Sequence, residues 1–166
     1  MSNPDRIICR LDVNGESREC AVAAQATLLE ALRYGLSMTG SKQGCDKGDC
    51  GACTVLLDGE PVLSCITLAM ACEGRAVTTI EGVAEGAKPH PLQDAFDVTG
   101  GAQCGFCTPG ILMSAYALLQ RERSPSREQI QHALSGNLCR CTGYTKIIDA
   151  VELAAKTLRE RSASGA

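Results

Sequence analysis

The sequence is poor in aromatic residues and in long apolar runs. Its 166 residues include no Trp, two Phe and three Tyr, so large rings cannot dominate the packing of its core. No apolar run approaches the length of a membrane span, and charged residues interrupt the first 13 positions, where an export signal would lie. We therefore expect a cytoplasmic protein with no membrane span.

The sequence also lacks features of several functional classes. The formal net charge is −3 and no basic stripe is present, which argues against nucleic acid as a partner. The only two histidines, His90 and His132, are not paired as in a Rieske centre. Because no nucleophilic triad, phosphate-binding loop or metal-hydrolase helix is present either, we expect no catalytic residue on this chain.

Cysteine is abundant instead. Eight of the eleven cysteines form two unlike quartets, the first of Cys45, Cys50, Cys53 and Cys65, and the second of Cys104, Cys107, Cys139 and Cys141. The first three follow the spacing of plant-type ferredoxins, whose thiolates hold a two-iron, two-sulfide cluster. Two quartets predict two metal centres, and electron transfer is the function that they favour.

Two other uses of these cysteines remain open. A secreted disulfide scaffold is disfavoured by the odd cysteine count and by the absence of an export signal. Two zinc sites are harder to exclude, because cysteine pairs with two intervening residues also suit zinc. The longer loop between Cys45 and Cys50, and the single residue between Cys139 and Cys141, argue against zinc.

The residue pattern changes along the chain and predicts an α+β fold. The first half suggests a small mixed sheet crossed by one helix: alternation at 7–13, an Asn14-Gly15 turn, a capping box at 27–30 and short strands at 54–57, 61–63 and 76–80. Glycine and proline mark 82–91 as a linker. The second half suggests helices at 92–98, from Pro109, after Ser126 until Gly136-Asn137 stops it, and from about Lys146, with a frayed tail at 161–166.

Three motifs make the chain resemble a known family. The segments at 44–55, 103–110 and 137–144 read GCDKGDCGACTV, QCGFCTPG and NLCRCTGY. They are similar to the small iron–sulfur subunit of the molybdenum hydroxylase, or xanthine oxidase, family. The resemblance runs from about Ile7 to Leu158, with no departure at any expected ligand position.

The resemblance implies a fold and a set of ligands. Residues 1–81 would form a plant-type ferredoxin domain of β-grasp fold, and 92–160 a four-helix domain. Each quartet would hold one [2Fe-2S] cluster. Gln103 and Cys141 would lie near a molybdopterin bound by a partner subunit.

The resemblance also implies partners and a function. The chain would relay single electrons between the molybdopterin of a large subunit, in its cytosine dinucleotide form, and the FAD of a medium subunit, within a heterotrimer or a dimer of heterotrimers. The rival interpretations are a free-standing ferredoxin-like electron carrier and a redox-sensing interaction module. The substrate of the complex, a purine, N-heterocycle, aldehyde, carbon monoxide or 4-hydroxybenzoyl-CoA, is left open because its pocket would lie on another chain.

Overall fold

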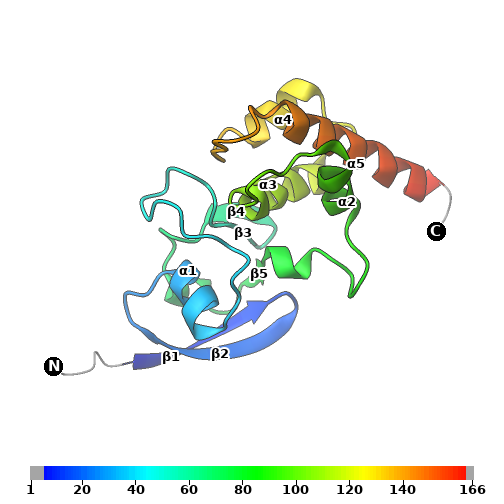
Figure 1. The fold of residues 1–166 in the computed structure, drawn as a ribbon. Helices are drawn as coiled ribbons and strands as arrows, with labels where there is room; N and C mark the ends of the chain where they lie inside the picture. Colours follow the sequence, from blue (N-terminus) through cyan, green and yellow to red (C-terminus); the bar gives the residue numbers. More distant parts are fainter. Residues whose placement is uncertain (1–5, 164–166) are drawn as a thin grey trace.

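The computed structural model describes residues 6–163, which form a mixed sheet followed by a group of helices (Figure 1). The strands are β1 (Arg6–Val13), β2 (Glu16–Ala23), β3 (Thr54–Leu57), β4 (Glu60–Leu63) and β5 (Ala76–Thr78). The α-helices are α1 (Leu28–Glu30), α2 (Pro91–Thr99), α3 (Thr108–Arg121), α4 (Arg127–Ala133) and α5 (Thr145–Ala163). The chain is thus a mixed helix-and-sheet protein, consistent with a ferredoxin-like fold. Within residues 6–163, no helix has both the length and the hydropathy needed to cross a bilayer.

The five strands form one sheet in the order β2-β1-β5-β3-β4. β1 and β2 make the predicted hairpin around Asn14-Gly15, with Val13 opposite Glu16. β5 pairs with β1 in parallel and with β3 antiparallel, so it joins the first hairpin to the second.

One helical segment covers a face of this sheet, as predicted. Thr27 accepts a hydrogen bond from the Glu30 amide, and the Glu30 carboxylate accepts from the Thr27 amide, which completes the expected capping box. α1 continues into a π-helical turn at Ala31–Gly35. Its buried side chains, Leu28 and Leu32, pack with Leu11 and other strand residues in the first core.

β5 is shorter than the predicted strand at 76–80. It ends at Thr78, and a 3-10 turn covers Ile80–Gly82. The Asn14 side chain accepts a hydrogen bond from the Thr79 amide at 2.9 Å and donates one to Thr79 Oγ1 at 3.0 Å. The Thr79 amide is therefore bonded to a side chain of the hairpin turn and is not available to pair in a longer strand.

The helices after residue 90 build a second core. Leu92, Ile111, Ile130, Ile147 and Val151 are fully buried there. The predicted capping box of Ser126 and Gln129 starts α4. The expected frayed tail at 161–166 is wrong at its beginning, because α5 runs on through residues 161–163; 164–166 lie outside the described residues. The helix continues because nothing at 161–163 is a helix breaker.

β3 is the strand that joins the two cores. Val55 and Leu57 belong to the sheet core, whereas Leu56 packs with Met113 and Ala117 of α3 and with Val83. All four residues of β3 are buried. In Figure 1, α3 lies next to β3 and β4. The helical part therefore covers the sheet on the side opposite α1.

Met113→Ala tests this shared packing. Met113 of α3 is fully buried against Leu56 of β3, so its truncation should lower the free energy of unfolding by about 2–5 kcal/mol. Urea denaturation of the full-length chain measures the change. Val98→Ala is the control, because Val98 is 77% exposed; an equal loss in both variants would contradict the assigned interface.

Candidate metal centres

The first quartet lies at the end of the sheet that leads into β3. Cys45 and Cys50 belong to the loop before β3, Cys53 directly precedes it, and Cys65 follows β4. The Cys45 and Cys50 thiols are within hydrogen-bonding reach of each other, and so are the Cys53 and Cys65 thiols. The Cys50 amide also lies 3.4 Å from Cys45 Sγ. The four sulfurs thus form two adjacent pairs.

The loop directs backbone amides at one of these sulfurs. Hydrogen bonds from the amides of Lys47, Cys50 and Asp49 lower the pKa of the Cys45 thiol to about 7. Burial has the opposite effect on Cys65, whose pKa it raises to about 11. Amides that point at a sulfur favour its anionic form, which is the form that binds metal.

The second quartet lies at the starts of two helices. Cys107 directly precedes α3, and Cys139 and Cys141 lie shortly before α5. Cys104 Sγ is 3.6 Å from Cys141 Sγ, and the Cys107 and Cys139 thiols are within hydrogen-bonding reach. These sulfurs again form two pairs, and the helix N-termini beside them carry partial positive charge.

The two pairs of the second quartet differ in exposure. Cys104 and Cys141 are exposed, whereas Cys107 and Cys139 are partly covered. Burial raises the pKa of Cys107 to about 12. Thr142 Oγ1 lies 3.1 Å from Cys139 Sγ. The second site therefore opens to the surface on its Cys104 and Cys141 side.

The donor set fits a binuclear iron–sulfide centre better than a single ion. Within residues 6–163, no three side chains of His, Cys, Asp or Glu are gathered as a single ion would need. A tetrahedral zinc site requires four ligands converging on one point. Two pairs of thiols suit two irons, each bound by two cysteine sulfurs. The remaining cysteines, Cys9, Cys20 and Cys72, are buried in the sheet core.

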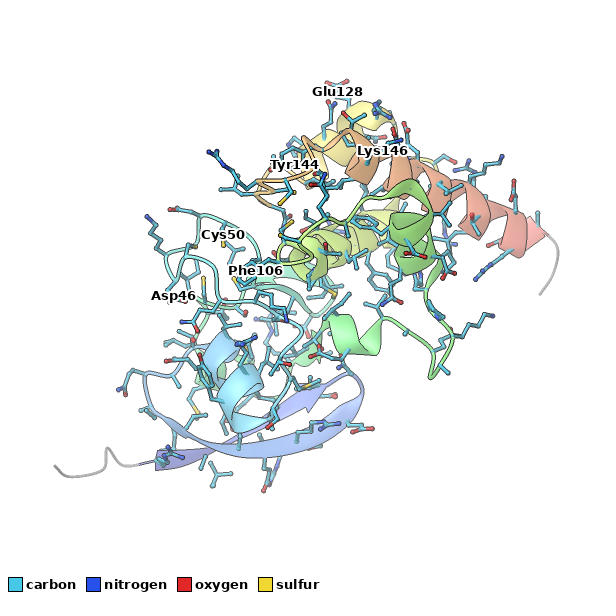
Figure 2. The ribbon with its side chains drawn as sticks, in the orientation of Figure 1. Asp46, Cys50, Phe106, Glu128, Tyr144 and Lys146 are labelled. Carbon is cyan, nitrogen blue, oxygen red and sulfur yellow. The ribbon has the colours of Figure 1, made fainter. Side chains whose placement is uncertain are left out.

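The two cysteine loops touch each other. The Leu138 amide, next to Cys139, donates a hydrogen bond to the Cys50 carbonyl at 2.9 Å. Figure 2 shows Cys50 close to Phe106, which lies between Cys104 and Cys107 of the second quartet. A methyl group on Gly44 would come within 2.7 Å of Cys50 Sγ and 3.5 Å of the Phe106 ring. A short path through backbone atoms therefore links a cysteine of each quartet.

Two glycines permit this close approach. A Cβ at Gly51 would lie 2.2 Å from the Gly136 carbonyl oxygen, and one at Gly110 would lie 2.2 Å from the Gly51 carbonyl oxygen. Gly51 also has a φ of +71°, which disfavours other residues. The first loop is thus held between the start of α3 and the segment before Cys139.

Sequence reasoning missed three residues that shape this junction. Asn137, expected only to stop a helix, is buried and bonds to Gly51. The Tyr144 hydroxyl accepts from the Cys139 amide at 2.8 Å and donates to the Asn137 carbonyl at 3.0 Å. Ser114 donates to Asn137 from α3. The one signal in the sequence that could have suggested a role is that Asn137 and Tyr144 stand at the two ends of the motif NLCRCTGY.

Gln103 is exposed immediately before Cys104. Its side-chain amide makes no hydrogen bond to any residue in 6–163. It is therefore available to a group outside the chain. Two apolar side chains beside the second quartet are exposed as well. Phe106, between Cys104 and Cys107, is 48% exposed, and Leu138, next to Cys139, is 57% exposed.

Comparisons with known proteins place this geometry in a family. Residues 11–80 match the 2Fe-2S iron-sulfur cluster binding domain, and residues 79–152 match the [2Fe-2S] binding domain. The nicotine 6-hydroxylase small subunit of Paenarthrobacter nicotinovorans is 51% identical over 150 residues, covering 90% of each chain. The nicotinate dehydrogenase small FeS subunit of Eubacterium barkeri is 46% identical over 150 residues, covering 90% of this chain and 96% of that one.

A solved structure agrees with these matches. A chain of quinoline 2-oxidoreductase from Pseudomonas putida 86 superposes with a TM-score of 0.89 at 43% identity, covering 93% of this chain and 97% of that one. The chain belongs to the small iron–sulfur subunits of the molybdenum hydroxylase, or xanthine oxidase, family.

Membership of the xanthine oxidase family confirms the predicted function. The chain is an electron-transfer subunit of a molybdenum hydroxylase-type oxidoreductase, with two [2Fe-2S]-binding domains. Family membership favours a subunit over a free-standing ferredoxin-like carrier or a redox sensor. It also favours iron over zinc or disulfides in the two quartets.

Gly110→Ala tests the contact between the first cysteine loop and the start of α3. In an ordinary helix this change stabilises by about 0.5–1 kcal/mol. Here the new methyl group would overlap the Gly51 carbonyl, so we expect a net loss of about 1–3 kcal/mol in the free energy of unfolding. Urea denaturation of the cluster-loaded chain measures it.

Gly136→Ala is the matched control. A Cβ there meets nothing within 4 Å, so its effect should stay within about 0.5 kcal/mol. A Gly110→Ala variant as stable as the wild type would mean that the first loop is not packed so closely on α3.

Proposed function

We propose that this chain passes single electrons between a molybdopterin centre on a large subunit and the FAD of a medium subunit. The observation that carries the proposal is the hydrogen bond from the Leu138 amide to the Cys50 carbonyl, which joins the two thiol quartets through backbone atoms. When bound, a [2Fe-2S] cluster takes up and releases one electron at a time. The chain can therefore divide the electron pairs released at molybdenum into single transfers toward the flavin.

The eight cysteines are the proposed metal ligands. Their pairing at both sites, the amides directed at Cys45 and the all-sulfur donor set support this assignment. The first cluster would be held by Cys45, Cys50, Cys53 and Cys65, and the second by Cys104, Cys107, Cys139 and Cys141. The chain itself contributes rigid loops, so that little rearrangement accompanies each transfer.

The second site is the one proposed to face the molybdopterin. Cys104 and Cys141 are exposed, and the free amide of Gln103 lies beside them. Phe106 and Leu138 offer apolar surface in the same loops, as a partner interface requires. The Gln103 side chain can donate a hydrogen bond to, and accept one from, a pterin of the cytosine dinucleotide form. The first site would then face the flavin.

The domain division of the family is proposed for this chain as well. Residues 1–81 would be a β-grasp ferredoxin domain, 82–91 a linker and 92–160 a four-helix domain. The separate cores of the sheet and of the helices support it. A heterotrimer or a dimer of heterotrimers in the cytoplasm is the proposed assembly, since cysteines there are kept reduced and are available to bind metal.

An N-heteroaromatic ring is the substrate class proposed for the complex. Nicotine, nicotinate and quinoline, named in the three similar proteins, all contain a pyridine ring. The two relatives are small subunits that this chain covers almost completely, which supports a shared subunit arrangement.

Cys50→Ala tests the direction of electron flow. The change removes a proposed ligand of the first cluster, so the purified complex should still be reduced at the molybdenum side by substrate but should lose turnover with a flavin-coupled acceptor. Rapid-mixing absorbance and steady-state assays measure the two steps separately. Full substrate-to-acceptor turnover in this variant would contradict the proposed route.

Cys72→Ala is the control for that experiment. Cys72 is a buried cysteine outside both quartets. This variant should keep its iron and sulfide content and its turnover. It shows whether an effect of Cys50→Ala comes from losing a ligand or from removing a cysteine anywhere in this half of the chain.

Gln103→Ala tests the proposed contact with the pterin. Loss of this amide should slow reduction of the second site by substrate or lower the molybdopterin content of the purified complex, while iron content stays unchanged. Gln131→Ala is the control, because Gln131 is exposed on α4. Kinetics and cofactor content equal to those of the wild type would make Gln103 incidental.

A further inference from the structure

We propose that Asn137 is a positioning residue that fixes the separation of the two cluster sites and thereby the rate of electron transfer between them. The inference rests on the proposed function, because it requires a cluster at each quartet. Asn137 is 3% exposed and binds no metal itself. It lies two residues before Cys139, in the segment that contacts the loop of the first quartet.

All the hydrogen-bonding groups of the Asn137 side chain are used, and they span both halves of the chain. Its Nδ2 donates to the Gly51 carbonyl at 3.0 Å and to Thr54 Oγ1 at 3.2 Å. Its Oδ1 accepts from Ser114 Oγ of α3 at 2.7 Å. One buried amide therefore ties the first cysteine loop and β3 to α3.

The main chain of Asn137 is fixed as well. Its amide donates to the Leu134 carbonyl at 2.9 Å, and its carbonyl accepts from the Tyr144 hydroxyl at 3.0 Å. Because the Tyr144 hydroxyl also accepts from the Cys139 amide, Asn137 and Cys139 are held by the same group. The Asn137 side chain, which bonds to the first loop, is therefore fixed relative to Cys139, a cysteine of the second quartet.

An apolar residue at 137 could fill this space but could not make the hydrogen bonds to Gly51, Thr54 and Ser114. It would remove the acceptor to which the buried Ser114 hydroxyl donates, which is unfavourable. The Gly51 carbonyl would keep its bonds from the Thr54 amide and hydroxyl, but these lie within the first half and do not reach the second cysteine segment. Apolar contacts are also non-directional, whereas a fully satisfied polar network allows one arrangement. The buried amide therefore selects a single placement of one loop on the other.

That placement controls the link between the sites. Leu138 follows Asn137 directly and donates to the Cys50 carbonyl, next to Gly51. If the hydrogen bond from the Asn137 amide to the Gly51 carbonyl breaks, the first loop can move away from the segment before Cys139. That displacement would lengthen the hydrogen bond from the Leu138 amide to the Cys50 carbonyl and separate the two quartets. Electron transfer falls steeply with separation, so a small displacement would slow it.

The test uses the full-length chain purified with its clusters. In Asn137→Ala we expect iron and sulfide contents like those of the wild type, weaker magnetic coupling between the two reduced clusters in electron paramagnetic resonance, and several-fold slower equilibration between them after photochemical reduction. A residue with only a structural role would lower stability without changing the coupling.

A second variant covers the case in which Asn137→Ala fails to take up its clusters. Thr54→Val is nearly isosteric. It removes one acceptor of the Asn137 amide and also the bond from the Thr54 hydroxyl to the Gly51 carbonyl, the other acceptor of that amide, so it should give a change in the same direction. Asn14→Gly is the matched control: it also removes an amide that makes two hydrogen bonds, both to Thr79, in a turn that accepts glycine. It should leave the coupling unchanged.

The outcomes separate this inference from the function on which it rests. If Asn137→Ala, or Thr54→Val where the first variant does not load, keeps both clusters with wild-type coupling and equilibration, the role of Asn137 is wrong and the proposed function stands. If wild-type protein purified without oxygen holds no iron and shows no signal after reduction with dithionite, the proposed function fails, and this inference fails with it.

Discussion

Backbone-to-backbone contact between two cysteine loops is the constraint on which the rest of the structure depends. The carbonyls of Cys50 and Gly51 meet the Leu138 amide and the Asn137 side chain, and glycine at 51 and 110 leaves room for the approach. An extra methyl group at either glycine would collide with a carbonyl. The two halves of the chain can therefore share one surface only because these positions carry no side chain. β3, buried on both faces, extends the same contact into the cores.

The parts of the fold that depend on neighbouring residues could be predicted from the sequence. Asn14-Gly15 fixes a hairpin, and Thr27 with Glu30 and Ser126 with Gln129 fix two helix starts, because each signal acts within four residues. The cysteine spacing belongs to the same class. It determines that short loops can bring together Cys45, Cys50 and Cys53, as well as Cys104 with Cys107 and Cys139 with Cys141. The place of Cys65 and the meeting of the two later pairs depend instead on contacts between distant parts of the chain.

The contacts between the halves could not be predicted in that way. Asn137 and Gly51 are 86 residues apart, and by local criteria the first is a helix stop and the second a loop glycine. β5 ended early for a similar reason, since the Asn14 side chain took the Thr79 amide from 65 residues away. Such long-range polar bonds carry no periodic pattern. The topology of the sheet, with β5 beside β1, brings Asn14 and Thr79 together, whereas Asn137 meets Gly51 where α3 packs on β3.

The two sites differ in how completely this chain encloses them. Cys53 and Cys65 of the first site are buried, whereas Cys104 and Cys141 of the second are exposed and flanked by Phe106 and Leu138. Solvent exposure is one of the factors that set the potential of an iron–sulfur cluster. The chain by itself therefore determines the surroundings of the first site more fully than those of the second. In the proposed complex, the partner surface that covers Cys104 and Cys141 would complete the second site, so its potential would depend on assembly.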